Sequence, residues 1–230
     1  MQATPVTIEP IAYIQTDFKE KFGIPRQSGR TSLISRIVFF EKYQTPDALR
    51  ELDGFSHLWL IFDFSKARDE NKPFSPTVRP PRLGGNRRVG VFASRSPFRP
   101  NYLGLSCVRF LGVEQSKEHG TVLLVEGADL LDNTPIFDIK PYLPHADRIE
   151  NAIGGYADGV KDHCLNVDFK EDLLALIPTD KRQGLIECLQ DDPRPSYQDD
   201  GREYKMDFCG VDVCFIVQGE TLTVTGIKTK

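Results

Sequence analysis

The sequence predicts a mainly β N-terminal part, of barrel or sandwich type, followed by a smaller α+β module. Short runs rich in β-branched and aromatic residues, separated by clusters of Gly, Pro, Asn and Asp, fill the first 145 residues. After residue 165 the pattern changes to helical segments and then to strands. Because strands and helices do not alternate regularly, a doubly wound parallel sheet is not expected.

The first part is expected to contain seven strands and one helix. The helix is predicted from Thr45 as the N-cap, Pro46 at the first helical position and Gly54 near the C-cap. The expected strands are residues 6–14, 33–40, 55–64, 89–94, 105–113, 122–126 and 136–142.

Residues 146–165 are expected to connect the two parts. Helices are predicted at 169–177 and 179–189, and strands at 205–208, 211–218 and 221–228. The last two strands are separated only by Gly219 and Glu220, which predicts a tight hairpin.

The composition indicates an ordinary globular protein. Hydrophobic residues make up 40% of the 230 residues and charged residues 27%, which is enough for a core and argues against disorder. No apolar run reaches the roughly 20 residues of a membrane span, and the N-terminus does not resemble a signal peptide. Five cysteines without a CxxC pair and four scattered histidines predict a reduced, cytoplasmic protein without a metal site.

Charge is unevenly distributed along this acidic chain. The formal net charge is −4, yet residues 79–101 contain six arginines and no acidic residue. Residues 150–230 contain nine basic and sixteen acidic residues. The sequence therefore predicts one basic face that an anionic partner could meet.

The basic segment combines arginine with residues that shape the backbone. Arg79 and Arg82 flank a Pro-Pro pair, and two glycines follow. Arginine makes forked hydrogen bonds with phosphate and stacks on bases. A single arginine is more often a solvated or ion-paired residue, but six in this framework favour an anion site, with RNA or a nucleotide as the leading candidate.

Other polar residues have simpler explanations. His57 lies in an apolar run and is expected to be a hydrogen-bonded core group, and Asp132 and Asp138 are expected to form ion pairs. The segment DPRPSY at 192–197 either stacks on a base or is a plain linker. P-loop, GxGxxG, GxSxG, HExxH and CxxC motifs are absent, which argues against the enzyme classes that depend on them.

Several of these clusters, in this order, resemble the TrmO (TsaA/YaeB-like) family of tRNA methyltransferases. The resemblance covers nearly the whole chain, and its long middle motifs are specific. It rests on PRQ (25–27), FSHLWLIF (55–62), RPPRLGGN (79–86), GVFASRSPFRPN (90–101), GLS (104–106), LLDNTPIFDIKPYLP (130–144) and DPRPSY (192–197).

The resemblance implies a β-barrel catalytic domain at residues 1–160 and a small α+β domain at 161–230 that assists tRNA binding. It implies a homodimer that uses S-adenosylmethionine. The methyl group would go to N6 of threonylcarbamoyladenosine, next to the anticodon of threonine tRNA. Two competing hypotheses are a non-enzymatic RNA-binding or adaptor barrel and a small-molecule methyltransferase.

The resemblance also assigns site residues. The cofactor carboxylate suits Arg26 or Arg95, and its ribose diol suits Asp132. Asn133 and Tyr102 stand where many relatives carry glycine and proline. The cofactor residues would be Pro25, Arg26, Gln27, Phe64, Ser65, Arg95, Leu105, Asp132, Asn133, Thr134 and Pro135. The catalytic candidates are Asp138, Lys140 and Tyr142. The RNA-binding candidates are Arg79, Arg82, Arg87, Arg88, Arg99, Arg194 and Tyr197.

Overall fold

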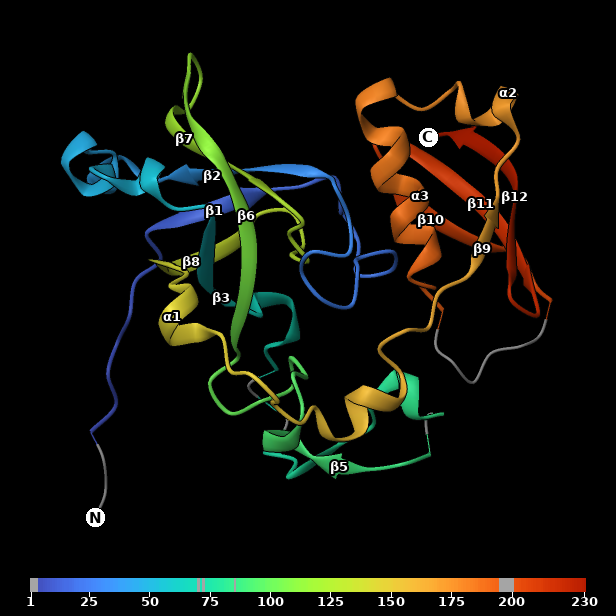
Figure 1. The fold of residues 1–230 in the computed structure, drawn as a ribbon, viewed down its shortest axis with the longest axis horizontal. Helices are drawn as coiled ribbons and strands as arrows, with labels where there is room; N and C mark the ends of the chain where they lie inside the picture. Colours follow the sequence, from blue (N-terminus) through green and yellow to red (C-terminus); the bar gives the residue numbers. More distant parts are fainter. Residues whose placement is uncertain (1–3, 70, 72, 85, 195–200) are drawn as a thin grey trace.

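The protein is mainly β, as predicted, and its largest unit is a six-stranded barrel (Figure 1). The structure is a computed structural model that describes residues 4–69, 71, 73–84, 86–194 and 201–230. The barrel strands are β1 (Ala12–Gln15), β2 (Ile34–Phe39), β3 (His57–Asp63), β6 (Leu103–Ser116), β7 (Gly120–Glu126) and β8 (Thr134–Pro141).

The barrel is closed by antiparallel pairing throughout. Its strand order is β1-β2-β7-β6-β3-β8, and β1 pairs with β8 to complete the ring. Alternate residues of each strand point inward, because successive side chains of a strand lie on opposite faces. The fully buried core includes Ile14, Ile37, Leu58, Leu60, Leu123 and Ile136.

The predicted strand at 89–94 is wrong beyond its first two residues. Only β5 (Val89–Gly90) is extended, and it pairs with β4 (Thr77–Val78). The next residues form the 3₁₀ turn η6 (Val91–Ala93), because the N–H of Ser94 donates to the carbonyl of Val91. Val91 is buried, so its apolar side chain reflects packing within a turn and does not indicate a strand.

The predicted helix after Thr45 is also wrong in kind. It is replaced by the 3₁₀ turns η2 (Pro46–Leu49) and η3 (Leu52–Gly54), which follow η1 (Glu41–Tyr43). Glu51 adopts a left-handed conformation with φ 65°, which a continuous helix does not allow.

The C-terminal module is a four-stranded sheet with α3 against it. The sheet order is β10-β11-β12-β9, and the predicted β11–β12 hairpin is confirmed by the pairing of Gln218 with Thr221. Strand β9 was not predicted, and the helix expected at 169–177 shortens to α2. The elements are β9 (Asn166–Asp168), α2 (Glu171–Leu174), η8 (Thr179–Lys181), α3 (Arg182–Gln190), β10 (Tyr204–Phe208), β11 (Val211–Gln218) and β12 (Thr221–Thr229).

The two parts have separate cores but are joined by the β1–β2 loop, residues 16–33. Phe18 and Leu33 of this loop are buried in the C-terminal core rather than in the barrel. The ring of Phe22 stacks on Tyr204 and Phe215 at centroid distances of 6.2 and 6.3 Å. Figure 1 shows the loop reaching from the barrel toward α3. The domain boundary near residue 160 stays a prediction.

The remaining short elements are η4 (Ser65–Ala67), η5 (Pro81–Leu83), α1 (Pro144–Asp147) and η7 (Gly155–Gly159). Within the described residues, no helix has the length and apolar character needed to cross a bilayer. The same residues contain no group of His, Cys, Asp and Glu arranged to hold a metal ion.

Candidate functional site

A cavity of about 730 Å³ lies at one end of the barrel, where β3 ends and β6 begins. Asp63 pairs with Leu103, so these two strand ends lie side by side. The β1–β2 loop and the segment between β5 and β6 complete the walls. Six of the predicted cofactor residues line it: Pro25, Arg26, Gln27, Phe64, Arg95 and Leu105.

Two polar contacts define the charged part of the cavity. Arg95 Nη1 donates to Gln27 Oε1 at 2.6 Å, so the guanidinium meets a neutral amide. Ser106 Oγ donates to Asp129 Oδ1 at 2.6 Å. Burial raises the pKa of Asp129, while the hydrogen bond from Ser106 and the charge of Arg95 act in the opposite direction. Asp129 is thus the acidic residue among the lining residues, whereas Arg26, Arg95 and Arg99 supply cationic groups.

The apolar wall of the cavity depends on a glycine. The rings of Phe62 and Phe64 pack edge to face with centroids 5.1 Å apart. A Cβ added at Gly104 would lie 2.3 Å from the Phe62 ring. Only glycine therefore allows β6 to approach Phe62 this closely.

The rest of the predicted cofactor loop lies elsewhere. Asp132 and Asn133 line a second, polar depression of about 230 Å³ together with Lys19, whose Nζ lies 2.6 Å from Asp132 Oδ2. The hydroxyl of Thr134 donates to the carbonyl of Leu131, and Pro135 pairs with Tyr13 in the barrel wall. Ser65 follows Phe64 in η4 and is not among the residues that line the cavity.

The predicted catalytic residues lie on the flank of the barrel. Lys140 Nζ forms an ion pair with Asp138 Oδ2 at 3.0 Å, and the Tyr142 ring lies 5.9 Å from Trp59. Asp138 pairs with Ile61, which in turn pairs with Leu105 of the cavity. Phe62 of the cavity wall follows Ile61 on β3, so one strand spacing, about 5 Å, separates the backbone of Asp138 from the strand that carries this wall.

The arginines of the basic segment fall into exposed and buried groups. Arg79, Arg87 and Arg88 are exposed, and Arg88 Nη1 donates to Thr77 Oγ1 at 2.8 Å. Arg99 is half-buried and lines the cavity, where its Nη1 donates to the carbonyl of Ser94 at 3.0 Å.

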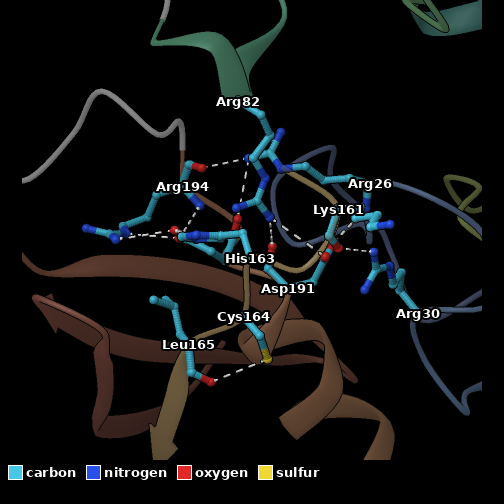
Figure 2. Close-up of polar contacts among 10 residues, drawn as sticks. Arg26, Arg30, Arg82, Lys161, His163, Cys164, Leu165, Asp191 and Arg194 are labelled. Atoms are coloured by element: carbon cyan, nitrogen blue, oxygen red, sulfur yellow. Dashed lines mark hydrogen bonds and ion pairs between the residues drawn. The ribbon is translucent and has the colours of Figure 1, made fainter. Parts of the chain in front are cut away.

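Arg82 and Arg194 occupy a buried cluster between the barrel and the C-terminal module (Figure 2). Arg82 Nη2 donates to the carbonyl of Asp191, and Arg194 Nε forms an ion pair with Asp192 Oδ1 at 3.0 Å. Both side chains are largely buried and paired, and their contact with RNA stays a prediction. Tyr197, also predicted to contact RNA, lies outside the described residues.

Comparisons with known proteins agree with the resemblance seen in the motifs. Residues 13–148 match the family described as the tRNA-methyltransferase O N-terminal domain, and residues 162–230 match the TrmO C-terminal domain. The chain belongs to the TrmO family. The sequence-based identification of this family, and with it a tRNA methyltransferase, is confirmed.

Relatives within the TrmO family extend over most of the chain. An Escherichia coli protein named tRNA (adenine(37)-N6)-methyltransferase is 41% identical over 83% of both chains. A Pseudomonas aeruginosa protein named as a putative S-adenosylmethionine-dependent methyltransferase is 40% identical over 90% of both. A crystal structure of TrmO from P. aeruginosa, 31% identical, superimposes with a TM-score of 0.78 over 100% of this chain and 99% of that one.

Among the residues that sequence reasoning missed are two aspartates, one in the cavity wall and one behind it. Asp129 precedes the predicted Asp132 by three positions, and it reaches the cavity because the chain after β7 continues beside β6 to meet Ser106. Asp191 stands just before the DPRPSY motif, which was the only signal for it. Local sequence predicts neither the contact of Asp129 with Ser106 nor that of Asp191 with Arg26, since each joins residues far apart in the chain.

Proposed function

We propose that this TrmO-family chain transfers a methyl group from S-adenosylmethionine to N6 of threonylcarbamoyladenosine, beside the anticodon of threonine tRNA. The observation that carries the proposal is the cavity that unites residues 25–27 with Phe64, Arg95 and Leu105. Family membership favours this hypothesis over a non-enzymatic barrel or a small-molecule methyltransferase.

The residues of the cavity fit this cofactor chemically. A volume of about 730 Å³ is within the range of small-molecule sites. Arg95, whose partner is neutral, would hold the cofactor carboxylate, and Asp129 would accept hydrogen bonds from its amino or hydroxyl groups. The aromatic rings of Phe62 and Phe64 offer an apolar wall for the adenine. When bound, S-adenosylmethionine supplies the methyl group as an electrophile.

The protein's own contribution is mainly to position the reactants. An in-line methyl transfer needs little covalent chemistry from the enzyme, so geometry and electrostatics dominate. The substrate nitrogen loses a proton during the reaction, and a nearby base would accept it. Asp138, Lys140 and Tyr142 remain the candidates for orienting that nitrogen, from the flank of the barrel across β3.

The exposed arginines would hold the tRNA. Arg79, Arg87 and Arg88 are free of carboxylate partners among the described residues, and they carry the charge that phosphates require. Arg99 lines the cavity and would contact the part of the tRNA that lies next to the cofactor. Because the substrate is tRNA, the proposed location is the cytoplasm.

The protein is further proposed to act as a homodimer. Large apolar side chains are exposed around the cavity: Phe92 by 77%, Leu105 by 54% and Phe98 by 53%. Such a patch at a ligand site is typical of a surface that a partner covers. Light scattering of the purified protein tests this, and a monomer at micromolar concentration would contradict it.

The activity is tested with threonine tRNA that carries threonylcarbamoyladenosine. The purified protein is incubated with this tRNA and S-adenosylmethionine labelled on the methyl group, and the nucleosides are analysed by mass spectrometry. We expect the label on the base of threonylcarbamoyladenosine. Labelling of an unmodified adenosine, or no labelling while a TrmO of known activity labels the same tRNA, would contradict the proposal.

A further inference from the structure

The loop at residues 191–194 of the C-terminal module holds the cavity loop at residues 25–27. Asp191 Oδ2 accepts a hydrogen bond from the backbone N–H of Arg26 at 2.9 Å. The guanidinium of Arg26 donates to the carbonyls of Arg194 at 2.6 Å and Asp192 at 3.4 Å. Because Pro25 and Gln27 on either side line the cavity, these contacts fix part of its wall from outside the barrel.

Asp191 also holds the basic segment. Its carbonyl accepts from Arg82 Nη2, and its Oδ1 lies 3.7 Å from the same nitrogen. The side chains of Arg82 and Asp191 are only 14% and 10% exposed, so solvent screens the pair weakly. Figure 2 shows Arg26 and Arg82 approaching Asp191 from different segments. One aspartate therefore joins three parts of the chain.

The cluster depends on its carboxylates. Burial lowers the pKa of Arg26, and the charge of Arg82 adds to this effect, whereas Asp191 and Asp192 raise it. Within the described part of the chain, Arg26 Nε and Arg82 Nη1 are buried without a hydrogen-bond partner. Without the charge of Asp191, two guanidinium groups would lie close together in a partly desolvated site.

The loop that presents Asp191 is itself well held. Asp192 accepts from Arg194 Nε at 3.0 Å and pairs with His163 Nε2 at 3.0 Å. Only 2% of its side chain is exposed. The loop is therefore rigid. A substitution at residue 191 should displace residues 25–27 and leave the loop itself in place.

We propose that Asp191 is a positioning residue for the cofactor cavity, by which the C-terminal module sets the place of residues 25–27 and ties them to Arg82. This inference rests on the proposed function, because it takes the cavity to be the S-adenosylmethionine site. It assigns the C-terminal module a part in cofactor binding, which is separate from the predicted part in tRNA binding.

The test measures binding of S-adenosylhomocysteine, a stable product of the reaction, by calorimetry. Asp191→Ala removes both the acceptor for Arg26 and the charge facing Arg82, whereas Asp191→Asn keeps an acceptor and loses only the charge. The control is Glu187→Ala. Glu187 Oε2 also accepts a backbone N–H from the β1–β2 loop, that of Ser32 at 2.6 Å, but Ser32 does not line the cavity.

We expect Asp191→Ala to raise the dissociation constant by about tenfold or more, and Asp191→Asn by about threefold, from the usual strengths of charged and neutral hydrogen bonds. Glu187→Ala should stay within about twofold of the wild type, since its contact is exposed. In the methylation assay the KM for S-adenosylmethionine should rise more than kcat falls. A purely structural role would instead lower the unfolding midpoint without this KM effect.

Three outcomes would overturn the inference. If Asp191→Ala binds within twofold of the wild type, or no more weakly than Glu187→Ala, the inference is overturned. If Asp191→Ala does not fold, Asp191→Asn is compared with Glu187→Gln, and equal affinities overturn it. Arg95→Ala separates the two proposals: unchanged binding there refutes the cavity and the inference together, whereas weakened binding there with unchanged binding in Asp191→Ala refutes the inference alone.

Discussion

The cavity at the barrel end and the cluster around Asp191 both use arginine, but in opposite ways. In the cavity, Arg95 is exposed and donates to the neutral amide of Gln27. In the cluster, Arg82 is largely buried and is paired with the carboxylate of Asp191. Both arginines come from the same 23-residue segment, residues 79–101, so composition alone does not distinguish them.

The difference shows what separates a binding arginine from a structural one in this protein. An arginine without a carboxylate partner keeps its charge available for an anionic ligand. A buried arginine that is paired with a carboxylate instead of water connects parts of the chain. Removing it leaves the carboxylate buried without its partner, which lowers the free energy of unfolding. Substitutions in each of the two regions test this distinction.

The shape of the cavity is tested by Gly104→Ala. The new Cβ would lie 2.3 Å from the Phe62 ring, so either β6 or the ring must move. We expect kcat/KM for methyl transfer to fall about 100-fold, as displacements near 1 Å do in enzymes. Gly90→Ala is the matched control, since a Cβ there meets nothing within 4 Å. Equal activity of the two variants would contradict the assigned wall.

The structural arginine is tested by Arg82→Ala. The change leaves the carboxylate of Asp191, only 10% exposed, without this cation, and we expect the free energy of unfolding to fall by about 2 kcal/mol. Arg88→Ala, at an exposed residue of the same segment, should change it by less than about 0.5 kcal/mol. Urea unfolding measures both, and similar values would remove the distinction between the two groups.

The acid of the cavity is tested by Asp129→Asn. Burial raises the pKa of Asp129, so the folded protein favours the protonated carboxyl more than the unfolded chain does. The stability this gives is complete below the unfolded pKa and is lost as pH rises through the folded pKa. Asparagine stays neutral and can still accept from Ser106.

The variant should therefore unfold at a higher temperature than the wild type at pH 7. This advantage should shrink as pH falls toward the ordinary range of aspartate. The variant should also bind S-adenosylhomocysteine more weakly than the wild type. Thermal unfolding at several pH values measures the first effect. A lower midpoint at pH 7 would show that the charged form of Asp129 stabilises the fold.

The exposed arginines are tested by Arg87→Ala and Arg88→Ala. Each phosphate contact that is lost should reduce the slope of log K against log salt by about 0.7 to 0.9, with little change in unfolding. Filter binding of threonine tRNA at several salt concentrations gives this slope. An unchanged slope in both variants would move the tRNA surface away from this segment.

Local sequence predicted the regular parts of the fold well. The barrel strands β2, β3 and β7 and the hairpin β11–β12 were expected from β-branched and aromatic runs, which directly reflect a pleated, half-buried surface. The apolar run after Val89 misled because Val91 is buried in a turn. The run after Thr45 misled because Glu51 adopts a left-handed conformation.

The site was predicted only where the motifs themselves line the cavity. Residues 25–27 and Arg95 were expected together, and the structure brings them together. Asp129 was missed because its place depends on how the chain leaves β7 beside β6. The contact of Arg82 with Asp191 spans 109 residues and joins the barrel to the C-terminal module, so no local pattern reveals it.

The central claim, that the barrel-end cavity is the cofactor site, is tested most directly by titrating S-adenosylhomocysteine into the wild type and Arg95→Ala. We expect the variant to bind at least about 10-fold more weakly, the usual effect of removing a hydrogen bond to a charged group, with an unchanged unfolding midpoint. Equal affinity of the two proteins would contradict the claim and place the cofactor elsewhere.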